Sequence, residues 1–331
     1  MQDTGERDRD RLAELITTLA SEEHPHGSPQ QQVGALFADY CDTEHRDRLG
    51  ASPLAPDLAV LADITTGDSL LRACGELSRA GITTLLGDEL VNDVEDPTRY
   101  QLIVWQAGLT LPDEAYYRED QHAELREQLP HFVNTLLGLC AEALPGGIAP
   151  ADAGQRILAF ETRLASHHWD AVTCRDTDAI LNPMTIAQMS EASGAPWEAY
   201  FDGTHAPAAV NDNLVVGQPS YLNGIGEMLR EVDLTEWTLW LTWRIVCDRA
   251  GLLHTPAYQA IFDFISRKIR GAKEPDKLER RAVQQCSGIL PIVVGRVYVE
   301  AFTPPRVKDA VRELMEDCRA AMGDTIAGSR A

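Results

Sequence analysis

Three residues from two segments of the chain could together carry nucleophilic chemistry. Ser69 lies in the run Gly67-Asp68-Ser69-Leu70, and Asp202 stands three residues before His205. Such a set could supply a serine nucleophile, a histidine base and an aspartate that orients the base. The residues before Ser69 instead read as a loop that caps a helix, whereas a nucleophilic serine of this type follows a buried strand. A serine hydrolase is therefore the least favoured of the functional alternatives.

The nine histidines do not form a recognisable metal motif. None is followed directly by glutamate, so the chain lacks the His-Glu-x-x-His pattern that binds zinc from one helix face. His167 and His168 are adjacent, and adjacent side chains on a helix point about 100° apart, which rarely lets them share an ion. His24 and His26 lie in a Pro-Gly loop without a third ligand nearby. We therefore predict no catalytic, cofactor-binding or metal-binding residue in this chain.

A basic cluster is the one candidate docking site for a partner. Its members are Arg267, Lys268, Arg270, Lys273, Lys277, Arg280 and Arg281. These side chains could dock an acidic partner, but cations that complement the dipole at a solvated helix end explain them better. Phosphate binding is not supported, because Gly224-Ile225-Gly226 lacks a third glycine and follows no strand.

Composition excludes several classes of protein. The chain has 331 residues, a formal net charge of −22 and 44% hydrophobic residues, which is enough to fill a core. The negative charge argues against nucleic acid or an anionic membrane as a partner. Seven scattered cysteines without Cys-x-x-Cys indicate neither a disulfide framework nor a zinc knuckle. With no signal peptide at the start and no run near the roughly 18 apolar residues of a membrane span, we expect a cytoplasmic protein.

Hydrophobic periodicity predicts a mostly α-helical fold with many helices. Apolar residues recur at spacings of three and four over 125–140, 157–164, 237–245, 261–269 and 307–318. The best strand candidate is the short run 214–216.

The domain organisation expected from the sequence has three parts. We expect an N-terminal tail and first helix over 1–34, a helical region over 35–322 with a candidate boundary near 145–150, and a C-terminal tail over 323–331. The outermost residues, 1–10 and 324–331, are expected to be frayed.

Several blocks, taken in order, resemble the N-terminal region of the neprilysin-like zinc metallopeptidases. The most specific is Gly108-Leu109-Thr110-Leu111-Pro112-Asp113 followed by Tyr116-Tyr117, which is similar to the family's Gly-Leu-x-Leu-Pro-Asp-x-x-Tyr-Tyr run. Further blocks lie at 37–42, 49–54, 93–100, 160–165, 182–185, 218–222 and 294–302. Together they cover about residues 35–322, and as an ordered set they are far more specific than any single motif.

The resemblance implies a helical region that, in whole enzymes, caps a thermolysin-like catalytic region and encloses the peptide-binding cavity. The family's zinc motif, third zinc ligand and substrate-gripping Asn-Ala-aromatic motif all belong to the half that this chain does not match. None of the six asparagines here is followed by alanine. No catalytic or zinc-binding residue of the family can therefore be carried onto a position of this chain.

Three hypotheses follow for the function. The first is a non-catalytic subunit that pairs with a separate chain bearing His-Glu-x-x-His, with zinc in that partner and a peptide substrate in the shared cavity. The second is a stand-alone protein that binds peptides or regulates a peptidase without catalysis. The third is a truncated product with exposed apolar surface where its missing half belongs. On its own, the chain is not expected to be an enzyme.

Overall fold

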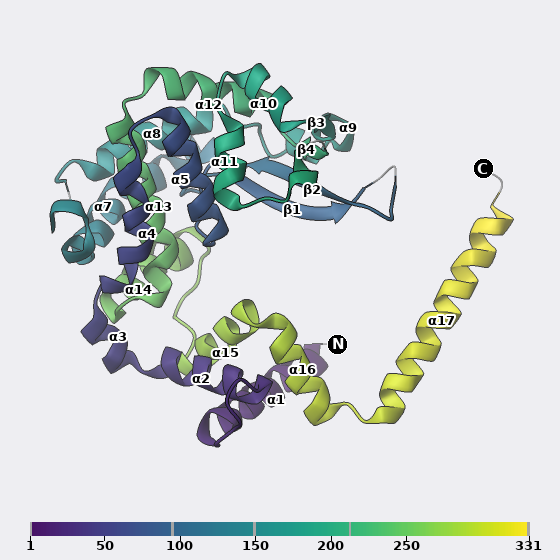
Figure 1. The fold of residues 1–331 in the computed structure, drawn as a ribbon. Helices are drawn as coiled ribbons and strands as arrows, with labels where there is room; N and C mark the ends of the chain where they lie inside the picture. The colour runs from purple at the N-terminus through teal and green to yellow at the C-terminus, as the bar shows by residue number, and fades with distance from the viewer. Residues whose placement is uncertain (1, 94–95, 148–149, 212, 330–331) are drawn as a thin grey trace. The chain divides into compact units, whose positions relative to one another are not determined.

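The computed structural model describes residues 2–93, 96–147, 150–211 and 213–329. The chain forms two compact units, one from residues 1–43 with 275–331 and the other from residues 44–274 (Figure 1). The candidate boundary near 145–150 lies within the second unit. The prediction of a mostly helical fold is confirmed, and each unit is described separately below.

The described residues of the first unit form five helices, and four of them, α17 excepted, surround a small core. The five are α1 (Gln2–Ser21), α2 (Pro29–Cys41), α15 (Leu278–Ile289), α16 (Pro291–Phe302) and α17 (Pro305–Gly328). Helix α2 begins at a Ser28 cap whose hydroxyl accepts from the Gln31 N–H, and it contacts α1, α15 and α16. The buried side chains include Ile16, Val33, Phe37, Cys286 and Val297. Most described residues of the two ends that were expected to fray are helical, because α1 starts at Gln2 and α17 continues to Gly328; residues 1 and 330–331 lie outside the described part.

Helix α17 carries an apolar stripe that is defined by its sequence spacing. The stripe is formed by Val307, Val311, Leu314, Met315 and Cys318, which were predicted to share one face of a helix. The structure confirms the helix and leaves the stripe exposed, with Leu314 60% and Met315 61% accessible.

In the described part of the chain, no single helix has the length and apolar character to cross a membrane. Helices α15 and α16, which are bent by 109° relative to each other, meet the length and composition criteria only as a pair.

The second unit contains the larger core, which surrounds helix α13 (Leu234–Arg249). Asp233 caps α13, and the middle of the helix is buried on all sides, with Trp237, Trp240 and Trp243 fully inaccessible. The other helices are α3 (Thr43–Leu49), α4 (Ala55–Ala59), α5 (Gly67–Arg79), α6 (Ala115–Arg118), α7 (Ala123–Leu139), α8 (Ala153–Ser166), α9 (Thr177–Ile180), α10 (Ile186–Ser193), α11 (Trp197–Thr204), α12 (Pro219–Glu231) and α14 (Thr255–Ile261). Helix α14 continues as a π-helical segment, Phe262–Ile269, where periodicity alone predicted an ordinary helix. Short 3₁₀ turns join the helices at Ser52–Leu54, Val60–Asp63, Asp120–His122, Ala141–Ala143, Pro145–Gly147, Thr173–Arg175, Ala208–Val210 and Ala250–Leu252.

A small mixed sheet lies beside these helices. Its strands are β1 (Leu86–Asn92), β2 (Tyr100–Gln106), β3 (Asn182–Met184) and β4 (Leu214–Val216), in the order β1-β2-β4-β3. Strands β1 and β2 pair antiparallel from Leu86 opposite Gln106, and β2 runs parallel to β4. The prediction of β4 is confirmed. Strand β3 is three residues long and carries Pro183, which a sheet tolerates at an edge.

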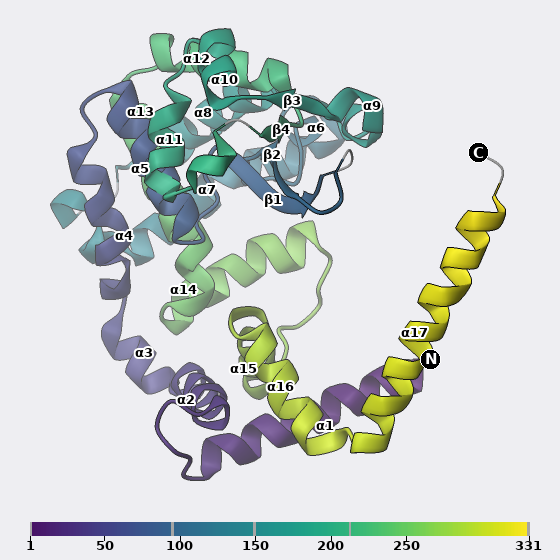
Figure 2. The same cartoon turned by 45° about the vertical axis from the view of Figure 1, so that its right-hand side comes forward.

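Helices α5 and α11 approach each other closely through two glycines, and they lie side by side in Figures 1 and 2. A methyl carbon added at Gly75 would lie 2.0 Å from the Tyr200 carbonyl oxygen. One added at Gly203 would lie 2.2 Å from the Arg72 carbonyl oxygen. Only glycine fits where the two backbones pass at this distance.

We predict that Gly75→Ala lowers the free energy of unfolding by about 2 kcal/mol or more, because α5 and α11 must separate to admit the methyl group. The measurement is urea denaturation followed by tryptophan fluorescence, since all six tryptophans lie in this unit. Gly138→Ala is the matched control. A methyl there meets nothing within 4 Å in α7, so stability should stay the same or rise by about 0.5 kcal/mol. Equal losses in the two variants would contradict the close approach.

Candidate functional site

A fully buried carboxylate joins two of the sequence blocks. Glu161, in α8, accepts hydrogen bonds from the Thr110 hydroxyl at 2.8 Å and the Thr110 N–H at 3.0 Å. The Tyr117 hydroxyl donates to the same carboxylate at 2.5 Å. The Gly108–Tyr117 block is thereby fixed onto α8 from both of its ends.

Further polar groups complete this buried network. The Trp243 indole N–H donates to the Thr110 hydroxyl at 2.8 Å, and the Leu111 N–H donates to the Tyr117 hydroxyl at 3.0 Å. Burial raises the pKa of Glu161, and the nearby positive charge of Arg244 opposes that shift. The network satisfies the polar groups of a loop that turns through the core, which is the condition for burying them.

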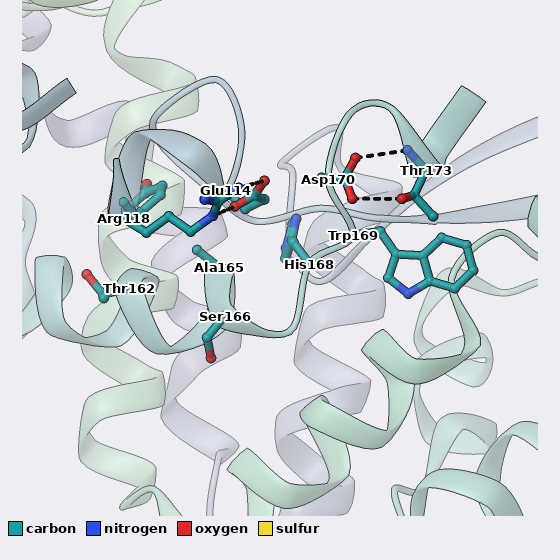
Figure 3. Close-up of a pocket in the computed structure, with 10 residues that line it drawn as sticks. Glu114, Arg118, Thr162, Ala165, Ser166, His168, Trp169, Asp170 and Thr173 are labelled. Atoms are coloured by element: carbon teal, nitrogen blue, oxygen red, sulfur yellow. Dashed lines mark hydrogen bonds and ion pairs between the residues drawn. The ribbon is translucent and has the colours of Figure 1, made fainter. Parts of the chain in front are cut away.

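A pocket of about 570 Å³ lies beside this network, in the second unit (Figure 3). Tyr117 forms part of its wall, so the buried carboxylate helps to position that wall. The remaining lining residues come from α6, α8 and the segment after α8. They are Glu114, Arg118, Thr162, Ala165, Ser166, His168, Trp169, Asp170 and Thr173.

The pocket region carries more negative than positive charge. Arg118 binds the Glu114 carboxylate at 2.6 Å and 3.1 Å, and its third nitrogen lies 3.2 Å from Glu119. Asp170 also interacts electrostatically with Arg118, so one guanidinium faces three carboxylates. Hydrogen bonds from the Thr173 hydroxyl and N–H lower the pKa of Asp170, which keeps it ionised.

His168 contributes no positive charge to balance these carboxylates. Burial lowers its pKa from the usual 6.5 to about 4, so the ring is neutral near pH 7. One ring N–H bonds the Ala107 carbonyl, and the Nε2 atom is buried without a hydrogen-bond partner in the described part of the chain. The pocket can accommodate a polar or cationic group, and its side chains show no pairing of a nucleophile with a base.

The resemblance implies a zinc enzyme, so the possible metal ligands among the described residues bear on the function. Within residues 2–93, 96–147, 150–211 and 213–329, no three His, Cys, Asp or Glu side chains are placed together to hold a metal ion. The donor set of the described residues does not fit zinc.

In the structure, the serine, histidine and aspartate that share the spacing of a hydrolase each make other contacts. The Ser69 hydroxyl accepts from the Thr65 and Thr66 N–H groups in the cap of α5, as expected for a helix start. Asp202 pairs with Arg72 at 3.2 Å. His205 ends α11 in a left-handed conformation, with φ of 56°. Each residue thus has a local structural role.

The basic cluster is divided between the two units. Arg267, Lys268, Arg270 and Lys273 belong to the second unit, while Lys277, Arg280 and Arg281 belong to the first. Arg267 pairs with Asp263, Lys268 donates to Gln128, and Arg280 lies 3.6 Å from Asp276. Docking of an acidic partner here stays a prediction.

Sequence reasoning did not identify the pocket. Glu114 and Arg118 are four residues apart, a spacing that brings them together on one helix face and that could have been noticed. Their proximity to His168 and Asp170 depends on tertiary packing, for which the sequence offers no signal.

The comparisons with known proteins agree with this architecture. The sequence model of peptidase family M13 matches residues 2–330. The structure is similar to that of the Mycobacterium tuberculosis zinc metalloprotease Zmp1 in its open state, with a TM-score of 0.90 and 30% identity, over 99% of this chain and 51% of that one. PepO from Lactobacillus rhamnosis shares the fold, with a TM-score of 0.75 and 19% identity, over 95% of this chain and 49% of that one. Rat endothelin-converting enzyme-like 1 is 24% identical over 97% of this chain and 43% of its own length. The chain therefore spans about half the length of these relatives, or less.

We predict that Glu161→Ala lowers the free energy of unfolding by about 3 kcal/mol or more. The change leaves a cavity and removes the acceptor of the Thr110 N–H and the Tyr117 hydroxyl. The measurement is urea denaturation followed by tryptophan fluorescence. As a control, Glu231→Ala removes an exposed partner of Arg163 and should cost less than about 1 kcal/mol. Similar costs for the two variants would show that the buried network does not stabilise the fold.

A second prediction concerns the pH dependence of stability. The folded-state pKa of His168 lies near 4 and its usual value is 6.5. Between these values the unfolded chain binds a proton that the folded chain does not, so the free energy of unfolding should fall as pH decreases from about 6.5 to about 4. His168→Asn should make the curve shallower in this window, and His205→Asn, at an exposed position, should not. If NMR shows His168 titrating near 6.5, the assignment is wrong.

Proposed function

This chain belongs to peptidase family M13, and we propose that it forms the helical, non-catalytic part of a zinc peptidase. It would associate with a separate chain that carries the His-Glu-x-x-His motif and the zinc ion. A peptide substrate would occupy the cavity enclosed by the two chains. The observation that carries the proposal is the match to Zmp1, which covers 99% of this chain and only 51% of that zinc metalloprotease.

The two partners would divide the work of hydrolysis. Bound zinc supplies the activated water and polarises the scissile carbonyl, and this chain contains no His-Glu-x-x-His sequence to bind it. The contribution of this chain is to form walls that exclude water and limit the size of the substrate. The rigid core around α13 and the buried Glu161 network suit a wall that must keep its shape.

The proposal predicts that peptidase activity depends on both chains. Each chain alone and an equimolar mixture with a zinc-bearing chain from the same cell would be assayed on a short quenched-fluorescent peptide and on casein. We expect the mixture to cleave the short peptide about tenfold faster or more than the zinc-bearing chain alone. Cleavage of casein should not rise in proportion, since the enclosed cavity admits only small substrates.

Two controls decide the outcome. Removal of zinc with a chelator should abolish the gain, and Ser69→Ala should leave it intact, because Ser69 only caps α5. A zinc-bearing chain that is fully active alone and unaffected by this one would overturn the proposal. Tight peptide binding by this chain without any zinc-bearing partner would favour a stand-alone binding protein instead.

A further inference from the structure

Several sources of negative charge converge on the pocket of the second unit. Glu114 lines this pocket and is 7% accessible, so its carboxylate lies in the wall rather than in bulk water. Asp170 lines the pocket as well, and Figure 3 shows His168 between these two side chains. Ser166 adds the last turn of α8, and the C-terminal end of a helix carries a partial negative charge. The lining therefore favours a positively charged ligand.

Arg118 does not neutralise this negative charge. Among the described residues that line the pocket it is the one cation, and 61% of its side chain is accessible, against 8% for the side chain of Glu114. Arg118 contacts Glu114 and Glu119 and interacts electrostatically with Asp170, so its charge is shared among three carboxylates. The guanidinium lies largely in solvent, where water screens it, while the Glu114 carboxylate lies in the less polar wall. A second cation inside the pocket is therefore attracted rather than repelled.

His168 leaves a hydrogen-bonding atom unused in the same wall. Its Nε2 atom is buried and has no hydrogen-bond partner within the described ranges of the chain. Buried nitrogens of this kind are normally bonded to protein, to water or to a ligand. The ring is uncharged near pH 7, because burial lowers the pKa of His168 to about 4, so it does not repel a cation. A polar ligand, directly or through a water molecule, could complete the bonding of this ring.

We propose that this pocket binds a small organic cation, with its alkylammonium or guanidinium group near Asp170 and Glu114. The volume of about 570 Å³ suits a small molecule. A bare metal ion is not expected, because the described residues place no three His, Cys, Asp or Glu side chains together. Tyr117 and Trp169 line the same pocket and supply aromatic surface for the carbon chain of the ligand. The lining comes from this chain, so the inference does not depend on a zinc-bearing partner.

Two sources of such a cation share this chemistry, a free polyamine and the lysine or arginine side chain of a peptide. The test is isothermal titration calorimetry of the full chain near pH 7 with two probes, 1,4-diaminobutane and a short peptide that has one central lysine and blocked ends. We expect saturable binding at a single site. The uncharged diol of the same length, 1,4-butanediol, should not bind. Tighter binding of the diamine identifies a free amine as the ligand, and tighter binding of the peptide identifies a side chain.

Two variants locate the binding. Asp170→Asn removes the charge but keeps an oxygen that can still accept from the Thr173 N–H, and it should weaken binding by at least about tenfold. Ser166→Lys places a permanent cation at an exposed position of the pocket wall and should abolish binding. Glu227→Gln is the matched control for net charge. It removes one exposed carboxylate of the same unit that does not line the pocket, and binding should stay unchanged.

Three results would overturn the inference. The first is the absence of saturable binding of either probe up to about 10 mM. The second is equal affinity of Asp170→Asn and the unchanged chain for both probes. The third is tighter binding of inorganic phosphate than of the diamine, which would make Arg118 the centre of an anion site. Urea denaturation of each variant shows whether a loss of binding reflects misfolding, and Ser166→Lys, at an exposed position, decides the question if Asp170→Asn is destabilised.

Discussion

The carboxylate of Glu161 is the constraint on which the second unit depends. It lies in the core without access to water, and a bare carboxylate there is costly. Three hydrogen bonds from Thr110 and Tyr117 offset that cost, and they can form only if the loop through Gly108 crosses the core above α8. The indole of Trp243 then completes the bonding of Thr110, which ties α13 to the same point. A single buried acid thus fixes two helices, one loop and one wall of the pocket.

The parts of the fold that could be predicted from the sequence are those set by local physical chemistry. The spacing of apolar residues predicted α7, α8 and α13. Strands β1 and β2 were missed because β1 is mostly exposed and alternates poorly, and because β2 combines exposed and buried positions without a regular pattern. Their pairing depends on contacts between distant segments, which periodicity does not report.

The candidate site could not be predicted for the same reason, because it depends on contacts between distant segments. No ordering of residue types in the sequence indicates that Asp170 would approach Arg118, or that His168 would lose its charge through burial. Helix α17 shows that a predicted helix face need not be buried. Its periodicity predicted which residues share a face, and that was confirmed, but a pattern of apolar residues does not say what covers them. Amphipathicity defines a face, whereas burial of that face requires a second surface.

The block that carries the family resemblance most strongly has a structural purpose in this chain. Gly108 has a positive φ of 98°, and Thr110 and Tyr117 bind the buried carboxylate. A sequence run that is specific to a peptidase family can therefore serve to position the wall of a pocket, as the run through Tyr117 does here. Family membership and catalytic chemistry are separate inferences for this chain. The first follows from the family model and the fold, and neither of them assigns a catalytic step to a residue of this chain.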